Sequence, residues 1–185
     1  MKKVTRDEVR SRAGYEAIRE DFRRNIFAQK KVRRVHVGPH LTFLFENHDT
    51  VLYQIQEMIR TEGIQGEAEI QHEIATYNEL VGEPGELVCT LLIEIEDKEK
   101  RQQLLSRWKD LPETIYIKTS NGRTIQANCD RRQVGENRIS SVQYLRFGIG
   151  DDLPGKLGTN RPDIATEVEL LPEQVSALVQ DLVSG

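Results

Sequence analysis

Three of the four histidines lie in one block, residues 33–58, together with carboxylates suited to metal binding or proton transfer. His36 and His40 flank a Gly-Pro turn, Glu46 ends the next apolar run, and Glu57 follows on a predicted helix. Imidazole and carboxylate groups are suitable ligands for Zn, Fe, Ni or Mn. One interpretation is therefore an enzyme or sensor with a metal or haem held by His36, His40 and Glu46 or Glu57.

The spacing of these residues matches no catalytic signature. His36 and His40 are four positions apart, but the interval crosses Gly38-Pro39, which is a turn signal and not a helix face. The chain also contains no GxSxG nucleophile elbow, no P-loop and no GxGxxG motif. The alternative is that both histidines lie on the surface or form hydrogen bonds that shape the turn.

The predicted helix after the apolar run presents polar groups on one side. Gln54 and Glu57 are three positions apart and share a helix face, and Tyr53 lies beside them. This face is either the wall of a polar pocket, a partner surface or a solvated amphipathic face. The complete candidate binding site comprises His36, His40, Glu46, Tyr53, Gln54 and Glu57.

Basic residues concentrate at the N-terminus of an otherwise acidic chain. Residues 1–34 carry twelve Lys or Arg against five Asp or Glu, a net of +7, whereas the whole chain has a net charge of −4 and the remainder −11. The basic patch consists of Lys30, Lys31, Arg33 and Arg34, and it raises the hypothesis of nucleic-acid or other anionic binding. The interleaved acids and the acidic pI argue against nucleic acid and favour a solvated helix face.

Length and composition predict one soluble domain. The chain has 185 residues, of which 37% are hydrophobic and 30% charged, and no apolar run is long enough to cross a membrane. The N-terminus lacks the apolar stretch of a secretory signal, so we expect a cytoplasmic protein. Cys89 and Cys129 form no CxxC pair, and we expect both as thiols.

The order of predicted elements indicates an α+β fold. Strands are predicted at residues 32–37, 41–46, 87–95, 114–119, 123–128, 140–149 and 164–170. Helices are predicted from residue 5, with Gly14 as a candidate break, at residues 15–30, 51–62, 70–81 and 97–111, and from residue 172 onward. Turn signals at Gly38-Pro39 and Asn121-Gly122 join neighbouring strands as hairpins. We expect a single domain with a mostly antiparallel sheet and hairpins, packed by several helices that include N-terminal helices and a C-terminal helix.

The domain organisation is expected to change at residue 150. Residues 1–150 are predicted to form the α+β core. Residues 151–185 begin with a stretch rich in Gly, Pro and Asp, which predicts an irregular connection before the C-terminal helix. That helix is expected to pack on the core.

The block VRRVHVGPHLTFLFENHDTVLYQIQEM resembles a bacterial family of unknown function, the domain-of-unknown-function family numbered 3501. The similarity extends from Thr5-Arg6-Asp7 through Tyr144-Leu145-Arg146-Phe147. The resemblance implies a redox or peroxide-handling context, because similar proteins are encoded near rubrerythrin-like and iron–sulfur oxidoreductase proteins. It supplies no activity and no catalytic residue. This chain lacks the cysteine sets and Glu-x-x-His pairs that hold a cluster or di-iron centre, which points to an accessory of a redox protein.

The leading interpretation is a non-catalytic accessory or binding protein, as a monomer or a homodimer, that recognises a partner through the hairpin and helix of residues 33–58. Exposed backbone at a sheet edge and the basic N-terminal helix are the expected contacts. The alternatives are an enzyme or sensor that binds a metal or haem, and a protein that binds nucleic acid through the basic N-terminal arm.

Overall fold

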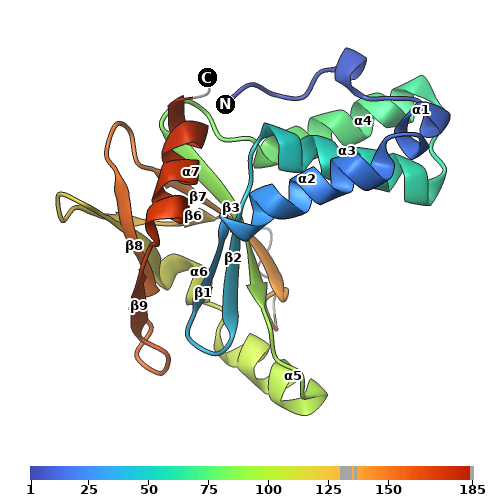
Figure 1. Cartoon of the computed structure of the whole chain (residues 1–185). Coiled ribbons are helices and arrows are strands. Elements are labelled where there is room, and N and C mark those ends of the chain that lie inside the picture. The colour runs from blue at the N-terminus through green and yellow to red at the C-terminus, as the bar shows by residue number, and fades with distance from the viewer. Residues whose placement is uncertain (130–134, 136, 184–185) are drawn as a thin grey trace.

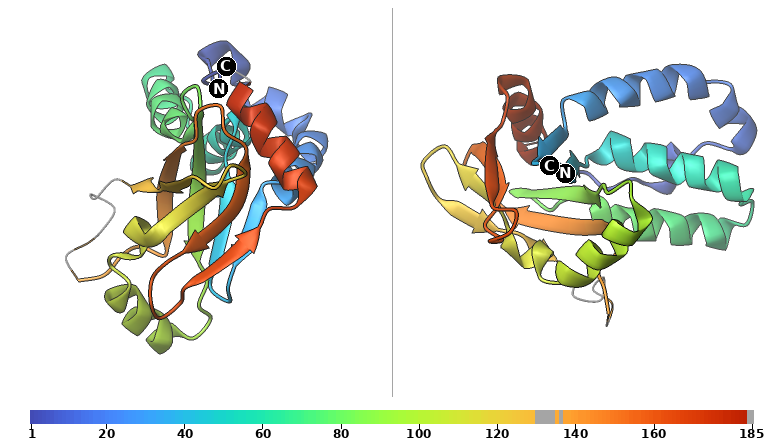
Figure 2. Two further views of the ribbon diagram at one scale, coloured as in Figure 1. Left: turned by 90° about the vertical axis from the view of Figure 1, so that its left-hand side faces the viewer. Right: turned by 90° about the horizontal axis from the view of Figure 1, so that it is seen from below.

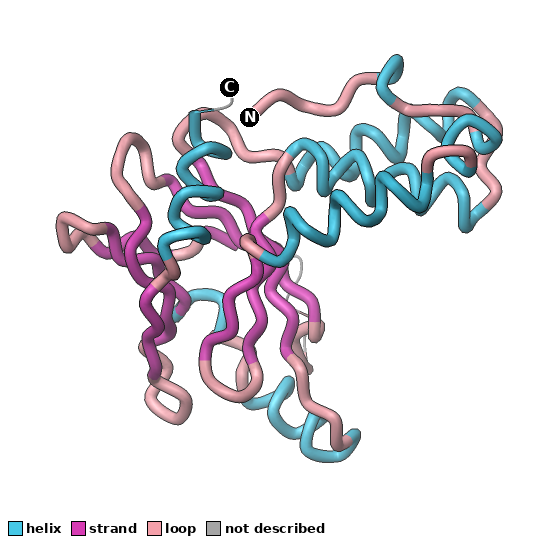
Figure 3. Tube along the Cα trace, viewed as in Figure 1, coloured by secondary structure: helices cyan, strands magenta, loops and turns pink. Residues whose placement is uncertain are grey.

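Two antiparallel sheets and a projecting group of helices make up the α+β fold (Figures 1 and 3). The computed structural model describes residues 1–129, 135 and 137–183. The helices, in chain order, are η1 (Arg6–Glu8), α1 (Arg12–Glu16), α2 (Arg19–Lys31), α3 (His48–Glu62), α4 (Glu67–Tyr77), η2 (Asn78–Leu80), α5 (Lys98–Arg107), α6 (Leu111–Thr114) and α7 (Pro172–Val183). The strands are β1 (Arg34–Val37), β2 (Leu41–Phe45), β3 (Glu86–Ile93), β4 (Ile115–Thr119), β5 (Thr124–Gln126), β6 (Asn128–Cys129), β7 (Val142–Gly148), β8 (Pro154–Thr159) and β9 (Thr166–Glu169).

The main hydrophobic core lies between the two sheets. The five-stranded sheet has the order β1-β2-β3-β7-β6 and the four-stranded sheet the order β5-β4-β8-β9. Phe43 and Leu91 from the first sheet and Ile117 and Leu157 from the second are fully buried in the same apolar cluster. Helix α7 contacts both β3 and β8 and therefore spans the two sheets. The predicted α+β class with antiparallel strands is confirmed, and the strands are divided between two sheets, of which the second buries the inner face of the first.

The β1–β2 hairpin and helix α3 form as their local sequence predicts. Val35 and Val37 are buried, whereas Arg34 and His36 are exposed, which is the alternation of a half-buried strand. Gly38 makes the turn with φ of +62°, a conformation that favours glycine. Asn47 then caps α3, because its side chain accepts a hydrogen bond from the Thr50 backbone N–H and its own N–H donates to the Thr50 hydroxyl.

Helices α2, α3 and α4 form a helical arm with its own core. Ile55 of α3 and Ile74 of α4 are buried together with Val4 of the N-terminal segment. Val88 of β3 belongs to the same cluster and so joins the arm to the outer face of the five-stranded sheet. Figure 2 shows, in its right-hand view, the four-stranded sheet on one side of the five-stranded sheet and the arm extending from the other. No helix within the described residues is long and apolar enough to span a bilayer.

The N-terminal helices differ from the prediction in where they break. The Thr5 capping box is present, with the Thr5 N–H donating to the Glu8 carboxylate at 2.8 Å, but it begins only the short η1 turn. The predicted continuous helix over residues 15–30 is wrong at residues 17–18, where α1 gives way to α2. Gly14 lies inside α1 and does not interrupt it.

Two predictions of secondary structure after residue 120 are wrong. The irregular connection predicted after residue 150 is wrong for Pro154–Thr159, which form β8 between β4 and β9. A Cβ atom on Gly158 would lie 2.7 Å from the Thr166 carbonyl oxygen, so glycine permits this pairing and does not mark a loop. The strand predicted at residues 123–128 is two strands, since β5 pairs with β4 in one sheet and β6 with β7 in the other.

Candidate functional site

A basic groove of about 650 Å³ lies where the end of α2, strand β1 and the start of α7 meet. Its lining consists of Phe27, Lys30, Lys31, Arg34, His36, Leu171 and Gln174. Gln174 fixes α7 against the hairpin, because its amide donates to the Arg34 carbonyl at 2.7 Å and accepts from the Leu171 N–H at 2.8 Å. The groove thus joins the predicted basic patch to the predicted hairpin.

Two cations of the groove, Lys31 and Arg34, have no acidic partner among the described residues. Lys31 and Arg34 form no ion pair within the part of the chain that the structure describes. Lys30 lies with its ammonium 5.2 Å from the centre of the Tyr53 ring, a cation–π contact. Burial lowers the pKa of the Lys30 ammonium, and the Glu46 carboxylate opposes that shift. The groove is therefore positively charged at neutral pH.

Two large apolar side chains project among these cations. Phe27 is 49% exposed and Leu171 is 52% exposed. The Arg23 guanidinium stacks over the Phe27 ring with 4.9 Å between its Cζ and the ring centre. Neither apolar residue was among the sequence candidates. The signal for Phe27 was present, since it follows Ile26 by one position and so falls off the apolar stripe that α2 buries.

Arg33 is the member of the basic patch that does not reach the groove. It points inward and forms a buried bidentate ion pair with Asp181 of α7, with distances of 2.8 and 2.9 Å. Three of the four predicted patch residues, Lys30, Lys31 and Arg34, therefore line one surface, and the fourth holds the elements of that surface together.

Glu46 lies buried between β3 and α3. Thr50 and Gln54 donate hydrogen bonds to one carboxylate oxygen at 2.7 and 3.1 Å, and Thr90 donates to the other at 2.8 Å. Because these donors come from α3 and β3, the carboxylate links the helix to the sheet. The structure thus brings Glu46 and Gln54 together, and the Lys30 ammonium approaches them from α2.

Glu57 is bound by side chains of α1 and α2 and not by those that bind Glu46. Arg19 donates two hydrogen bonds to its carboxylate at 2.7 and 2.9 Å, and the Tyr15 hydroxyl donates a third at 2.7 Å. The Arg19 guanidinium lowers the pKa of Glu57 to about 2, against the opposing effect of burial. Glu57 therefore connects α3 to α1 and α2.

The histidines of the hairpin each have a separate partner. His36 Nδ1 lies 2.9 Å from the Thr42 hydroxyl, which donates to the Glu94 carboxylate. His40 Nδ1 lies 3.2 Å from the Glu94 carbonyl oxygen, and its ring is 5.9 Å from that of Trp108. The structure does not bring the proposed ligands His36, His40, Glu46 and Glu57 together. Within the described residues, no group of three or more His, Cys, Asp or Glu side chains is placed to share a metal ion.

The two cysteines are separate and differ in exposure. Cys89 is fully buried in the main core, and burial raises the pKa of its thiol well above the ordinary value. Cys129 on β6 is partly buried.

The comparisons with known proteins agree on the fold and give no activity. The chain is similar to a crystal structure of a novel protein of unknown function from Burkholderia pseudomallei K96243, with 28% identity and a TM-score of 0.90. The similarity covers 98% of this chain and 100% of that one. A comparison with curated proteins finds no match. Residues 3–182 match the model of the family described as protein of unknown function, DUF3501, and the chain therefore belongs to that family.

Proposed function

We propose that this protein is a non-catalytic accessory protein that binds an acidic partner protein in the basic groove. The observation that carries the proposal is the position of Phe27 and Leu171, each about half exposed, beside Lys31 and Arg34, which have no ion-pair partner among the described residues. Apolar side chains buried at the centre of an interface supply most of its affinity, whereas charges at the rim steer association.

The chemistry of the groove defines the partner segment. It should present one or two apolar side chains to Phe27 and Leu171, with Asp or Glu residues placed to meet Lys31 and Arg34. A protein segment fits this combination better than nucleic acid, whose phosphates would use the cations and leave Leu171 without an apolar contact. From the family resemblance, the partner to test is a redox protein with an acidic surface.

The experiment is affinity capture from an extract of the source organism, followed by titration of the purified partner by isothermal calorimetry. We expect an acidic protein to bind, and cross-links to map to the groove. Phe27→Ala with Leu171→Ala should weaken binding at least tenfold, and Lys31→Glu with Arg34→Glu should slow association at low salt. Leu153→Ala is the matched apolar control, because Leu153 is 48% exposed but lies outside the groove. Lys98→Glu on α5 is the charge control.

The outcomes that contradict the proposal are distinct. Equal binding by the groove variants and the controls would place the interface elsewhere. Loss of the bound species on nuclease treatment would favour nucleic acid, and its affinity would then fall steeply with salt. A concentration-dependent dimer that the groove variants dissolve would show that a second copy of this chain occupies the groove.

A further inference from the structure

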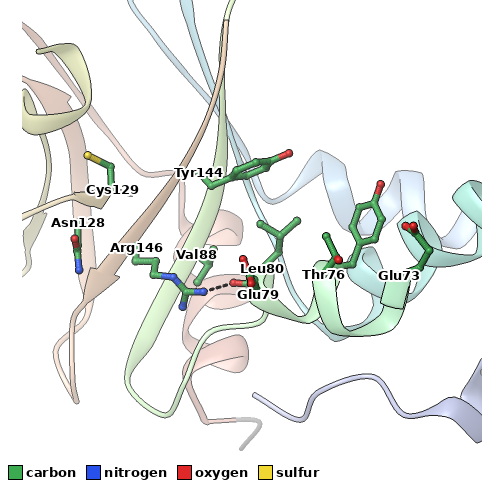
Figure 4. Close-up of a pocket in the computed structure, with 10 residues that line it drawn as sticks. Glu73, Thr76, Glu79, Leu80, Val88, Asn128, Cys129, Tyr144 and Arg146 are labelled. Atoms are coloured by element: carbon green, nitrogen blue, oxygen red, sulfur yellow. Dashed lines mark hydrogen bonds between the residues drawn. The ribbon is translucent and has the colours of Figure 1, made fainter. Parts of the chain in front are cut away.

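A second cavity, of about 570 Å³, lies where α4 and η2 face the outer side of β3, β6 and β7. We call it the tyrosine pocket, after Tyr77 and Tyr144, which line it from opposite sides. In Figure 4, Tyr144 rises from β7 opposite Leu80, Thr76 and Glu73 of η2 and α4. This volume falls in the range that small-molecule sites occupy. No part of the basic groove contributes to it.

The tyrosine pocket has an apolar floor and aromatic walls. Leu80 and Val88 form this floor, and both are buried in the apolar cluster beneath the helical arm. Tyr144 is 41% exposed, which leaves a large part of its side chain accessible. Burial, together with the charge of Glu73 and the proximity of Tyr144, raises the pKa of the Tyr77 hydroxyl. The Tyr77 ring is thus neutral at physiological pH, and both tyrosines line the pocket with their aromatic rings.

Among the described residues that line the tyrosine pocket, the unpaired charge is negative. The carboxylates of Glu73 and Glu79 have no hydrogen bond or ion pair within the described residues. Arg146 lines the same pocket, but its guanidinium is engaged by the Glu86 carboxylate at 2.7 Å and by the Glu79 carbonyl. Of the described lining residues, Arg146 is therefore already neutralised by a residue outside the lining, whereas Glu73 and Glu79 are not.

We propose that the tyrosine pocket binds a small organic cation, a molecule that joins an ammonium or guanidinium group to an apolar body. Tyrosine faces attract such a cation through their quadrupoles, and the attraction is stronger where water is partly excluded. Glu73 and Glu79 supply the opposite charge, and Leu80 and Val88 accept the apolar body. An anionic ligand would meet two unpaired carboxylates and a guanidinium that is already bound.

The test uses the full chain and three cationic probes, benzyltrimethylammonium, phenethylammonium and benzylguanidinium. Binding is followed by shifts of assigned NMR signals, with the neutral 3-phenylpropanol and the anionic 3-phenylpropionate as probes of similar size. We expect saturable shifts at Tyr77 and Tyr144 for at least one cation. The neutral probe and the anionic probe should each bind at least tenfold more weakly.

Variants separate recognition from folding. Glu73→Gln combined with Glu79→Gln should weaken the cation about tenfold, whereas Glu62→Gln, an exposed carboxylate on α3 outside the pocket, should not. Tyr144→Phe keeps the π face and should bind as the parent protein does, but Tyr144→Leu keeps only the apolar bulk and should bind more weakly. Failure of all three cations to saturate, equal affinity for the neutral probe, or unchanged binding by the double glutamine variant would each overturn the proposal.

Discussion

The guanidinium of Arg33 forms a bidentate ion pair with the carboxylate of Asp181, and the two side chains are each 7% exposed. The partners are 148 positions apart in the sequence. The Asn47 amide also donates to Asp181 at 3.3 Å, so the start of α3, the end of α2 and helix α7 meet at one carboxylate. This junction sets the position of α7 beside β1 and with it the walls of the basic groove.

The ion pair predicts a large cost for removing one partner. Asp181→Ala leaves the Arg33 guanidinium buried and unpaired, and breaking a buried pair in this way costs about 3–5 kcal/mol. We expect chemical denaturation of Asp181→Ala to show a loss of that size. Glu83→Gln is the comparison, because Glu83 pairs with Lys3 on the surface, with 65% and 54% of the side chains exposed, and such pairs contribute about 0–1 kcal/mol. Equal effects of the two substitutions would contradict the buried role of Asp181.

Local signals predicted the hairpin and α3 because the residues that decide them are neighbours. Gly38, Asn47 and Gly63 each act within a few positions: a turn, a cap and a helix end with φ of +67°. Arg33 shows what local signals miss. Its type and place suggested a surface cation beside Lys31, and only the distant Asp181 determines that it turns inward.

The same reasoning explains the outcome for the candidate site. Gln54 and Glu57 are three positions apart on α3, yet different elements pack against them. Thr90 of β3 meets the side of Glu46 and Gln54, whereas Arg19 of α2 meets Glu57. Sequence periodicity gives the direction of a side chain relative to its helix and does not give the partner that lies there.

The depressed pKa of Glu57 predicts a contribution to stability that disappears in acid. Its pKa is about 2 in the folded protein against an ordinary value of 4.5. Unfolding therefore takes up a proton between those values, and the stabilisation is complete above about pH 4.5 and is lost as the pH falls through about 2. The difference in unfolding free energy between the parent and Glu57→Gln should be largest at pH 7 and shrink below pH 4.5.

Arg19→Met provides an independent measurement of the same pair. Removing the guanidinium takes away the main cause of the low pKa, so the Glu57 carboxyl should titrate at higher pH in this variant. Carbon-13 NMR of the labelled carboxyl group measures it directly. An unchanged titration of Glu57 would mean that Arg19 is not the group that holds its pKa low.

The position of Lys30 beside Glu46 predicts a coupling across the arm and the sheet. Burial already lowers the pKa of the Lys30 ammonium, and the Glu46 carboxylate limits the shift. Glu46→Gln removes the negative charge, which disfavours the charged ammonium further, so the pKa of Lys30 should fall. Titration of carbon-13 lysine signals, with Lys30→Arg to assign the resonance, gives the value. A rise in the pKa of Lys30, or no change, would mean that the Glu46 carboxylate does not stabilise the charged ammonium.

Gly158 and Gly148 form a matched pair that tests why the sequence did not predict β8. Both lie in strands, but a Cβ atom at Gly158 would come within 2.7 Å of the Thr166 carbonyl oxygen and 2.9 Å of the Tyr116 hydroxyl, whereas at Gly148 it would meet nothing within 4 Å. Gly158→Ala must push β9 away from β8, and overpacking of this kind costs about 1–3 kcal/mol.

Gly148→Ala should be neutral or slightly stabilising, because alanine loses less backbone entropy on folding than glycine does. Thermal unfolding of both variants, monitored by circular dichroism, compares them directly. If Gly158→Ala melts with the parent protein, the close approach of β8 and β9 is not what requires glycine there. If only Gly158→Ala is destabilised, then β8 needs glycine at this position to pair with both β4 and β9, although the same glycine contributed to the prediction of a loop.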